Sequence, residues 1–258
     1  MRSLALFVPV AYLAHTRLRK APELWGLLIL TEWLPAGLVL LLLGGRGPLD
    51  VLVGFGLAYG AFITVYEIGY LANDLLAFRE KGGRSRLGEV PPSVGLVAVA
   101  VLARLAIFIL LTIVLGRSGE VGWWGVYGLL AAAFTLHNVL VHPGLRGATF
   151  VHLATTRILA PVFSFLAPEV LLPLVAGVLP AYVLPRLLAY LESKDALSLP
   201  GRATTGFKVR FHAALLLPGA LLAVLLHSWI PFLVCLYYLV VWTAAWTLGI
   251  GRSREALS

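Results

Sequence analysis

The residues best suited to chemistry include a polar patch at the end of an apolar segment, formed by Tyr66, Glu67, Tyr70, Asn73 and Asp74. Glu67 and Asp74 are seven residues apart, so in a helix they differ by only ~20° and share one face. Glu67 lies within the apolar segment, where an ionisable group costs about 3 kcal/mol and marks a functional interior. A purely structural ion pair with a nearby arginine is the alternative interpretation of Glu67.

A second polar patch follows another apolar segment and contains Tyr190, Glu192, Lys194 and Asp195. Glu192 and Asp195 are three residues apart, which makes them neighbours on a helix surface. Basic residues follow both patches, namely Arg79, Lys81, Arg84 and Arg86 after the first and Arg202, Lys208 and Arg210 after the second. Carboxylates suit Mg²⁺ and guanidinium groups suit phosphate oxygens. The patches therefore predict a site for a metal and a diphosphate, with a solvated, charge-decorated helix end as the alternative.

The composition places both patches in a membrane protein. Of 258 residues, 60% are hydrophobic and 12% charged, and the mean hydropathy is +0.94, which argues against a soluble enzyme. With about 20 residues per crossing, we expect one all-α domain over residues 1–258, a polytopic transmembrane helical bundle of about eight spans. The expected spans are 24–43, 51–72, 94–115, 122–141, 150–166, 169–188, 211–227 and 229–250.

The apolar run at residues 4–14 is about half as long as a membrane crossing. Arg17, Arg19 and Lys20 follow it, without a small-residue cleavage site. We expect an interfacial or poorly inserted helix there, and the alternatives are a ninth span or the core of a signal peptide.

Basic residues are distributed unevenly between the two sides of the expected bundle. Two of them, Arg46 and Arg117, fall on one side. Fifteen fall on the other, namely Arg17, Arg19, Lys20, Arg79, Lys81, Arg84, Arg86, Arg146, Arg186, Lys194, Arg202, Lys208, Arg210, Arg252 and Arg254. Because Lys and Arg accumulate in cytoplasmic loops, we expect both termini and the long polar loops 73–93 and 189–210 in the cytoplasm. The asymmetry also explains the net charge of +8 without a nucleic-acid partner.

The polar patches at the ends of the second and sixth spans resemble those of the UbiA-type superfamily of intramembrane prenyltransferases. The first motif of that family reads Asn-Asp-x-x-Asp-x-x-x-Asp. Asn73 and Asp74 match its first two positions, and Ala77 and Lys81 stand at its later acidic positions. The second motif of the family, Asp-x-x-x-Asp, has its counterpart in the patch that holds Glu192 and Asp195, with a spacing shorter by one residue.

The resemblance implies a UbiA-like bundle that binds Mg²⁺ and an isoprenoid phosphate lipid at the cytoplasmic mouth of a lipid-open cavity. It implies a transferase that moves a prenyl or phosphosugar group. The residues it implicates are Asp74, Asn73, Glu67 and Tyr70 at the catalytic centre, Asp74, Glu192 and Asp195 as metal ligands, and Arg79, Lys81, Arg84, Tyr190, Lys194 and Arg157 in substrate binding.

Two arginines within the expected spans support an alternative function. Arg104 and Arg157 should each face the bundle interior and a partner, and Glu32 and Glu67 are the candidate partners. In a non-catalytic lipid-binding protein or a transporter, Glu67, Arg104 and Arg157 would line a polar pathway. The histidines near the fourth and fifth spans have spacings that favour packing or headgroup contacts over a metal site.

Overall fold

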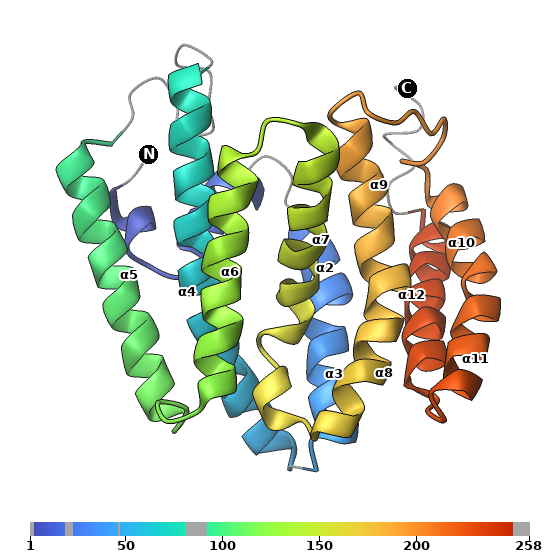
Figure 1. The fold of residues 1–258 in the computed structure, drawn as a ribbon. Coiled ribbons are helices and arrows are strands. Elements are labelled where there is room, and N and C mark those ends of the chain that lie inside the picture. Colours follow the sequence, from blue (N-terminus) through green and yellow to red (C-terminus); the bar gives the residue numbers. More distant parts are fainter. Residues whose placement is uncertain (1–2, 19–22, 46, 81–91, 250–258) are drawn as a thin grey trace.

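The computed structural model describes residues 3–18, 23–45, 47–80 and 92–249, and every regular element in these ranges is a helix. The elements are η1 (Ser3–Leu6), α1 (Ala11–Leu13), η2 (Ala14–Leu18), α2 (Glu23–Leu28), η3 (Ile29–Trp33), α3 (Leu34–Leu43), α4 (Pro48–Glu80), α5 (Val94–Val114), α6 (Val121–Val139), α7 (Pro143–Leu159), η4 (Phe163–Phe165), α8 (Pro168–Val178), η5 (Leu179–Val183), α9 (Leu184–Glu192), α10 (Thr205–Ala214), α11 (Leu216–Leu225) and α12 (Ile230–Thr247). The long helices run side by side and form a bundle (Figure 1).

Six helical segments of the described chain are long and apolar enough to cross a bilayer, which indicates an integral membrane protein. They are Trp25–Leu43, Pro48–Phe78, Val94–Val114, Pro168–Glu192, Thr205–Leu225 and Ile230–Thr247. Two of them contain a π-helical turn, η3 in the first and η5 in the fourth. Such turns change the direction of the side chains that follow and are frequent at functional sites. Here η3 carries Glu32 and η5 carries Tyr182.

The helices expected at 122–141 and 150–166 are α6 and α7, which are not among the six segments. α7 begins and ends earlier than expected, for local reasons. The Nδ1 atom of His142 accepts a hydrogen bond from the N–H of Gly144 at 3.2 Å, and Pro143 takes the first helical position. The helix ends at Leu159, just before Pro161. α6 packs against α4 and α7, and α7 packs against α9, so both helices lie within the bundle.

The apolar run at residues 4–14 does not form one continuous helix. It is divided between η1, α1 and η2, and Val10 between them has φ 70°, a conformation that β-branched residues rarely adopt. Leu6 and Tyr12 are each 1% exposed and pack with Leu71 of α4 and Ala100 of α5. The segment is therefore folded into the bundle beside α4 and α5.

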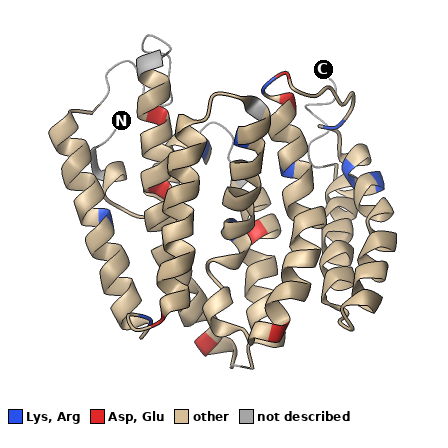
Figure 2. Ribbon diagram, viewed as in Figure 1, with Lys and Arg blue, Asp and Glu red and all other residues tan. Residues whose placement is uncertain are grey.

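Charged residues lie at both ends of the bundle, and both signs occur at each end (Figure 2). At one end, three acidic residues stand at the starts of helices, where the helix dipole favours negative charge. These residues are Asp50, Glu120 and Glu169. At the other end, Lys and Arg gather where α9 ends and α10 begins. The cytoplasmic location of this basic end stays a prediction.

Candidate functional site

The residues that the sequence predicted at the catalytic centre lie on two different faces of α4. Glu67 and Asp74 face the N-terminal segment and bind it, which confirms that the two carboxylates share a face. Tyr70 and Asn73 instead line a cavity on another face of the helix. Because each residue of a helix is rotated by about 100° from the preceding one, the adjacent side chains of Asn73 and Asp74 point in different directions and contact different parts of the protein.

Glu67 forms a buried ion pair with Arg104 of α5. The two side chains are 0% and 1% exposed, and Arg104 Nη1 lies 2.6 Å from Glu67 Oε2. The Glu67 carboxylate also accepts hydrogen bonds from the backbone N–H groups of Val10 and Leu13, at 3.2 and 2.7 Å. Arg104 in turn donates to three backbone carbonyls of the N-terminal segment, the closest being that of Leu6 at 2.7 Å. The Glu67–Arg104 pair thus replaces backbone hydrogen bonds that the N-terminal segment would form internally if it were one continuous helix.

Asp74 is bound by two side chains of the N-terminal segment. The hydroxyl of Tyr12 donates to Asp74 Oδ2 at 2.7 Å, and Arg17 Nη2 donates to Oδ1 at 2.9 Å. Burial, followed by the neighbouring carboxylate of Asp74, raises the pKa of Tyr12, so the phenol stays protonated and remains a donor. Asp74 is 3% exposed, and both of its oxygens are occupied by donors from the chain.

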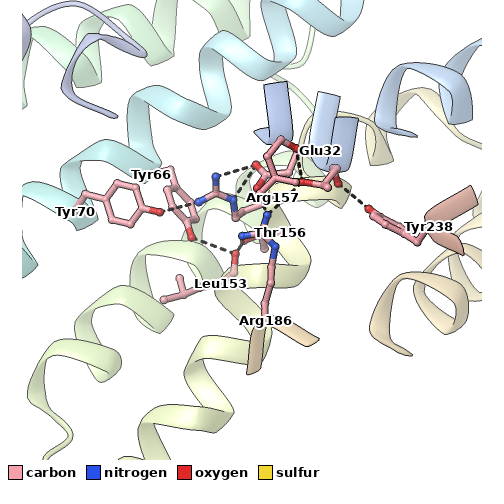
Figure 3. A network of polar contacts seen from close by, with 10 residues as sticks. Glu32, Tyr66, Tyr70, Leu153, Thr156, Arg157, Arg186 and Tyr238 are labelled. Atoms are coloured by element: carbon pink, nitrogen blue, oxygen red, sulfur yellow. Dashed lines mark hydrogen bonds and ion pairs between the residues drawn. The ribbon is translucent and has the colours of Figure 1, made fainter. Parts of the chain in front are cut away.

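A third carboxylate, Glu32 in η3, holds two arginines at once (Figure 3). Arg157 Nε and Nη2 donate to Glu32 Oε2 at 2.9 and 2.8 Å, and Arg186 Nη2 donates to Oε1 at 2.7 Å. Arg157 also donates to the hydroxyl of Tyr70 at 2.7 Å. Glu32, Arg157 and Arg186 together form what we call the Glu32 cluster. Two guanidinium groups share one carboxylate, so this cluster carries an excess positive charge. The expectation that Arg104 and Arg157 find their partners in Glu32 and Glu67 is confirmed, and Arg157 pairs with Glu32 and Arg104 with Glu67.

Tyr70 connects the Glu32 cluster to Asp74. Its hydroxyl accepts from Arg157, while the guanidinium of Arg17 stacks over its ring at 4.7 Å from the centroid. A continuous series of polar contacts therefore runs from Asp74 through Arg17, Tyr70 and Arg157 to Glu32. Tyr70 positions two arginines, a function that its aromatic face and its hydroxyl perform separately.

A cavity of about 190 Å³ lies beside the Glu32 cluster, and we call it the Arg157 cavity. Its walls come from α4, α6, α7 and α9, and it is lined by Tyr66, Tyr70, Asn73, Phe134, His137, Asn138, Phe150, Leu153, Ala154, Arg157, Arg186 and Tyr190. The side chain of Arg157 is 10% exposed and that of Arg186 is 37% exposed. Arg186 is therefore the guanidinium more accessible to a ligand.

Two polar groups of the Arg157 cavity have no hydrogen-bond partner within the described chain, the hydroxyl of Tyr190 and Oδ1 of Asn138. The ring of Tyr190 is held by stacking on Phe150, with 4.6 Å between centroids and 15° between planes. His137 forms a hydrogen bond with the hydroxyl of Thr149 at 2.8 Å. A buried polar group without a partner costs about 1–3 kcal/mol, so a ligand that forms hydrogen bonds with the Tyr190 hydroxyl or the Asn138 carbonyl would recover this cost.

Comparisons with known proteins leave the family open. No family model matches the sequence. No curated protein and no solved structure matches it either. The UbiA-type resemblance therefore stays a proposal.

The proposed metal ligands are not assembled in the described chain. Glu192, in the last turn of α9, is bound by Arg202 Nε at 2.6 Å, and Asp195 follows in a left-handed conformation with φ 55°. Asp74 lies on α4, and α6 and α7 stand between α4 and α9. No group of three or more His, Cys, Asp or Glu side chains that could hold a metal occurs among the described residues. The donor set in this arrangement does not fit Mg²⁺.

Some predicted substrate-binding residues fall at the margin of the site or beyond the described part. Lys194 does not line the cavity, but its Nζ lies 6.0 Å from the centroid of the Tyr190 ring, which does. The side chain of Arg79 and the residues Lys81 and Arg84 lie outside the described residues.

Sequence reasoning did not assign roles to Tyr12, Arg17 and Asn138. Arg17 stood out only as one of many basic residues. A basic cluster lies close in sequence to the apolar run at 4–14. This proximity was the signal that could have suggested a buried ion pair.

Proposed function

We propose that this protein is a UbiA-like membrane transferase that acts on an isoprenoid phosphate or diphosphate and moves a prenyl or phosphosugar group. The observation that carries the proposal is the Glu32 cluster. Two arginines share one carboxylate at the wall of a cavity that also presents the unpartnered Tyr190 hydroxyl. A buried excess of positive charge favours an anion, and planar guanidinium groups suit phosphate oxygens.

The position of the Arg157 cavity also supports a lipid phosphate. His137 and Asn138 lie in the last turn of α6 and Tyr190 in the last turn of α9. These helix ends lie at the end of the bundle where the basic residues gather (Figure 2). The ligand phosphate would thus enter from the basic end, while the aromatic walls contact the first part of an apolar chain.

Binding of the phosphate by arginines is the part of the proposal that the described residues support best. Asp74 and Glu192 are each paired with an arginine, so we derive no step that passes through Mg²⁺. A requirement for Mg²⁺ is an expectation from the resemblance. We propose that Arg186 and Arg157 compensate the phosphate charge, which is the electrostatic role that transfer reactions of phosphates need.

The alternative of a polar pathway is less well supported. Glu67 and Arg104 bind each other and the N-terminal backbone, and neither lines the Arg157 cavity. A pathway through Glu67, Arg104 and Arg157 would require these two residues to release the N-terminal segment.

Binding of geranylgeranyl diphosphate to the purified protein in neutral detergent tests the proposal. Calorimetry should detect binding to the wild type, and Tyr190→Phe should weaken it by about ten- to a hundredfold, because a hydrogen bond to a charged group contributes about 1.5–3 kcal/mol. Tyr127→Phe is the matched control, since Tyr127 also has a buried, unpartnered hydroxyl but does not line the cavity. A parallel titration with EDTA measures the dependence on Mg²⁺.

Equal effects of Tyr190→Phe and Tyr127→Phe, or no binding by the wild type with or without Mg²⁺, would contradict the proposal. Transfer is distinguished from simple binding by release of diphosphate in the presence of membrane lipid extract. Tight binding of the probe without release of diphosphate in any acceptor fraction would exclude prenyl transfer.

A further inference from the structure

A second cavity, of about 240 Å³, lies on the other side of Arg186, between η3, η5, α9, α10 and α12. We call it the Lys208 cavity. Its deepest residues are polar and buried, with Thr31, Tyr182, His212 and Tyr238 between 1% and 4% exposed. Arg186 lines both this cavity and the Arg157 cavity. The Glu32 cluster therefore separates two cavities.

Three cations line the Lys208 cavity, namely Arg186, Arg202 and Lys208, and none of its described lining residues is a carboxylate. Glu32 binds Arg186, but it is shared with Arg157, and Glu192 binds Arg202. Arg186 thus shares its carboxylate with a second guanidinium group. Lys208 Nζ lies 4.3 Å from the ring centroid of Trp242, a contact that directs the ammonium group along the cavity wall.

The ring of His212 lies between two backbone carbonyls. Nδ1 lies 2.7 Å from the carbonyl oxygen of Lys208, and Nε2 lies 3.0 Å from that of Ala181. A carbonyl oxygen only accepts hydrogen bonds, so the neutral ring donates to one of these two oxygens. These contacts fix the ring in the wall of the Lys208 cavity.

The rim of the Lys208 cavity is apolar and half-buried, formed by residues such as Leu27, Leu188, Phe211 and Trp242. Next to it, Ile29 and Leu30 are 43% and 39% exposed on the first candidate span. The cavity therefore combines a cationic interior with an edge that continues onto an apolar outer surface. Basic pockets between transmembrane helices suit the head groups of anionic lipids.

We infer that the Lys208 cavity binds the phosphate of an anionic glycerophospholipid, whose acyl chains lie against the apolar rim and the outer face of the bundle. Arg186, Arg202 and Lys208 contact the phosphate oxygens. The inference does not depend on what the Arg157 cavity binds. Because Arg186 lines both cavities, a lipid in the Lys208 cavity also fixes the guanidinium that faces the other one.

Native mass spectrometry of the protein with phosphatidylglycerol tests this inference, with phosphatidylcholine as the neutral lipid. The wild type should retain phosphatidylglycerol more strongly, and Lys208→Gln should weaken its apparent affinity about fivefold, as expected for one basic residue at a membrane surface. Lys208→Arg should restore binding. Arg210→Gln is the matched control, because Arg210 lies on the same helix and is exposed but does not line the cavity.

Three results would overturn the inference. The first is equal retention of the two lipids by the wild type. The second is an equal loss of phosphatidylglycerol in Lys208→Gln and Arg210→Gln, which would show a diffuse surface effect. The third is displacement of phosphatidylglycerol by millimolar inorganic phosphate, which would assign the site to free phosphate. Tyr190→Phe should leave phosphatidylglycerol retention within twofold of wild type, so failure here is distinguishable from failure at the Arg157 cavity.

Discussion

Arg104 Nη1 and Glu67 Oε2 lie 2.6 Å apart, and the same two side chains bind the backbone of the N-terminal segment at Leu6 and Leu13. Irregular backbone within a membrane protein is stable only where the protein itself satisfies its N–H and C=O groups. The ion pair does so for a segment that is interrupted at Val10. These contacts favour the structural ion pair, which the sequence left open for Glu67 beside a catalytic role.

Replacing Glu67 tests this structural role. Glu67→Leu leaves Arg104 buried without its carboxylate and should lower the free energy of unfolding by about 3–5 kcal/mol. Hydrogen exchange at the amides of Val10 and Leu13 should accelerate. Asp50→Leu is a control on the same helix, because Asp50 is exposed in the first turn, and should cost less than about 1 kcal/mol. Similar melting temperatures for Glu67→Leu and wild type would refute the role.

Asp74 should also act through the N-terminal segment. Asp74→Asn weakens the contacts with Arg17 and Tyr12 and should cost about 1.5–3 kcal/mol, the contribution of hydrogen bonds to a charged group. Tyr12→Phe removes one of these bonds and should cost less. Thermal denaturation in detergent measures both. If Asp74→Asn instead keeps wild-type stability and abolishes Mg²⁺-dependent binding of geranylgeranyl diphosphate, Asp74 is a metal ligand.

Arg157 and Glu32 should be energetically coupled. Arg157→Leu removes two hydrogen bonds to Glu32 and one to Tyr70, and should lower the free energy of unfolding by about 1.5–3 kcal/mol. In the double variant with Glu32→Leu, the cost should be smaller than the sum of the single costs by about 0.5–3 kcal/mol. Strictly additive costs would show that the two residues do not interact.

Gly69 controls the shape of the Arg157 cavity from within α4. A Cβ atom at Gly69 would lie 2.4 Å from the ring of Phe134, which packs on Tyr66 and Tyr70. Gly69→Ala should displace this ring and cost about 1–3 kcal/mol, with weaker binding of geranylgeranyl diphosphate. Gly56→Ala is the matched control, because nothing lies within 4 Å of a Cβ there. Equal stability of the two variants would show that Phe134 moves without cost.

The number of crossings is testable with single cysteines in a Cys235→Ala background. Ser118, Val141 and Ser198 are exposed and lie in three different connections, after α5, α6 and α9. If α6 and α7 both cross the bilayer, cysteines at Val141 and Ser198 should react with an impermeant reagent from the same side, and a cysteine at Ser118 from the other. The basic asymmetry predicts that Ser198 is cytoplasmic. Labelling of Val141 and Ser118 positions from one side would mean that α6 and α7 do not cross.

The sequence was sufficient for features that depend on local composition and on the cost of charge in an apolar medium. Long apolar runs predicted the transmembrane helices, and six of them are long enough to cross a bilayer. The rule that an intramembrane charge needs a partner predicted that Arg104 and Arg157 pair with buried carboxylates, and the structure assigned Glu67 to the first and Glu32 to the second. Only a few carboxylates were available inside the spans, so each arginine had few possible partners.

The tertiary structure decided which neighbour covers each face of a helix. Helical periodicity placed Glu67 and Asp74 on one face, but it could not show that the N-terminal segment covers this face and occupies both carboxylates. Nor could it show that Arg186, far away in sequence, joins Arg157 on Glu32. Periodicity is a property of one helix, whereas a site depends on the packing of several. The local pattern therefore predicted the charged residues, and only the packed bundle determined which of them face a cavity.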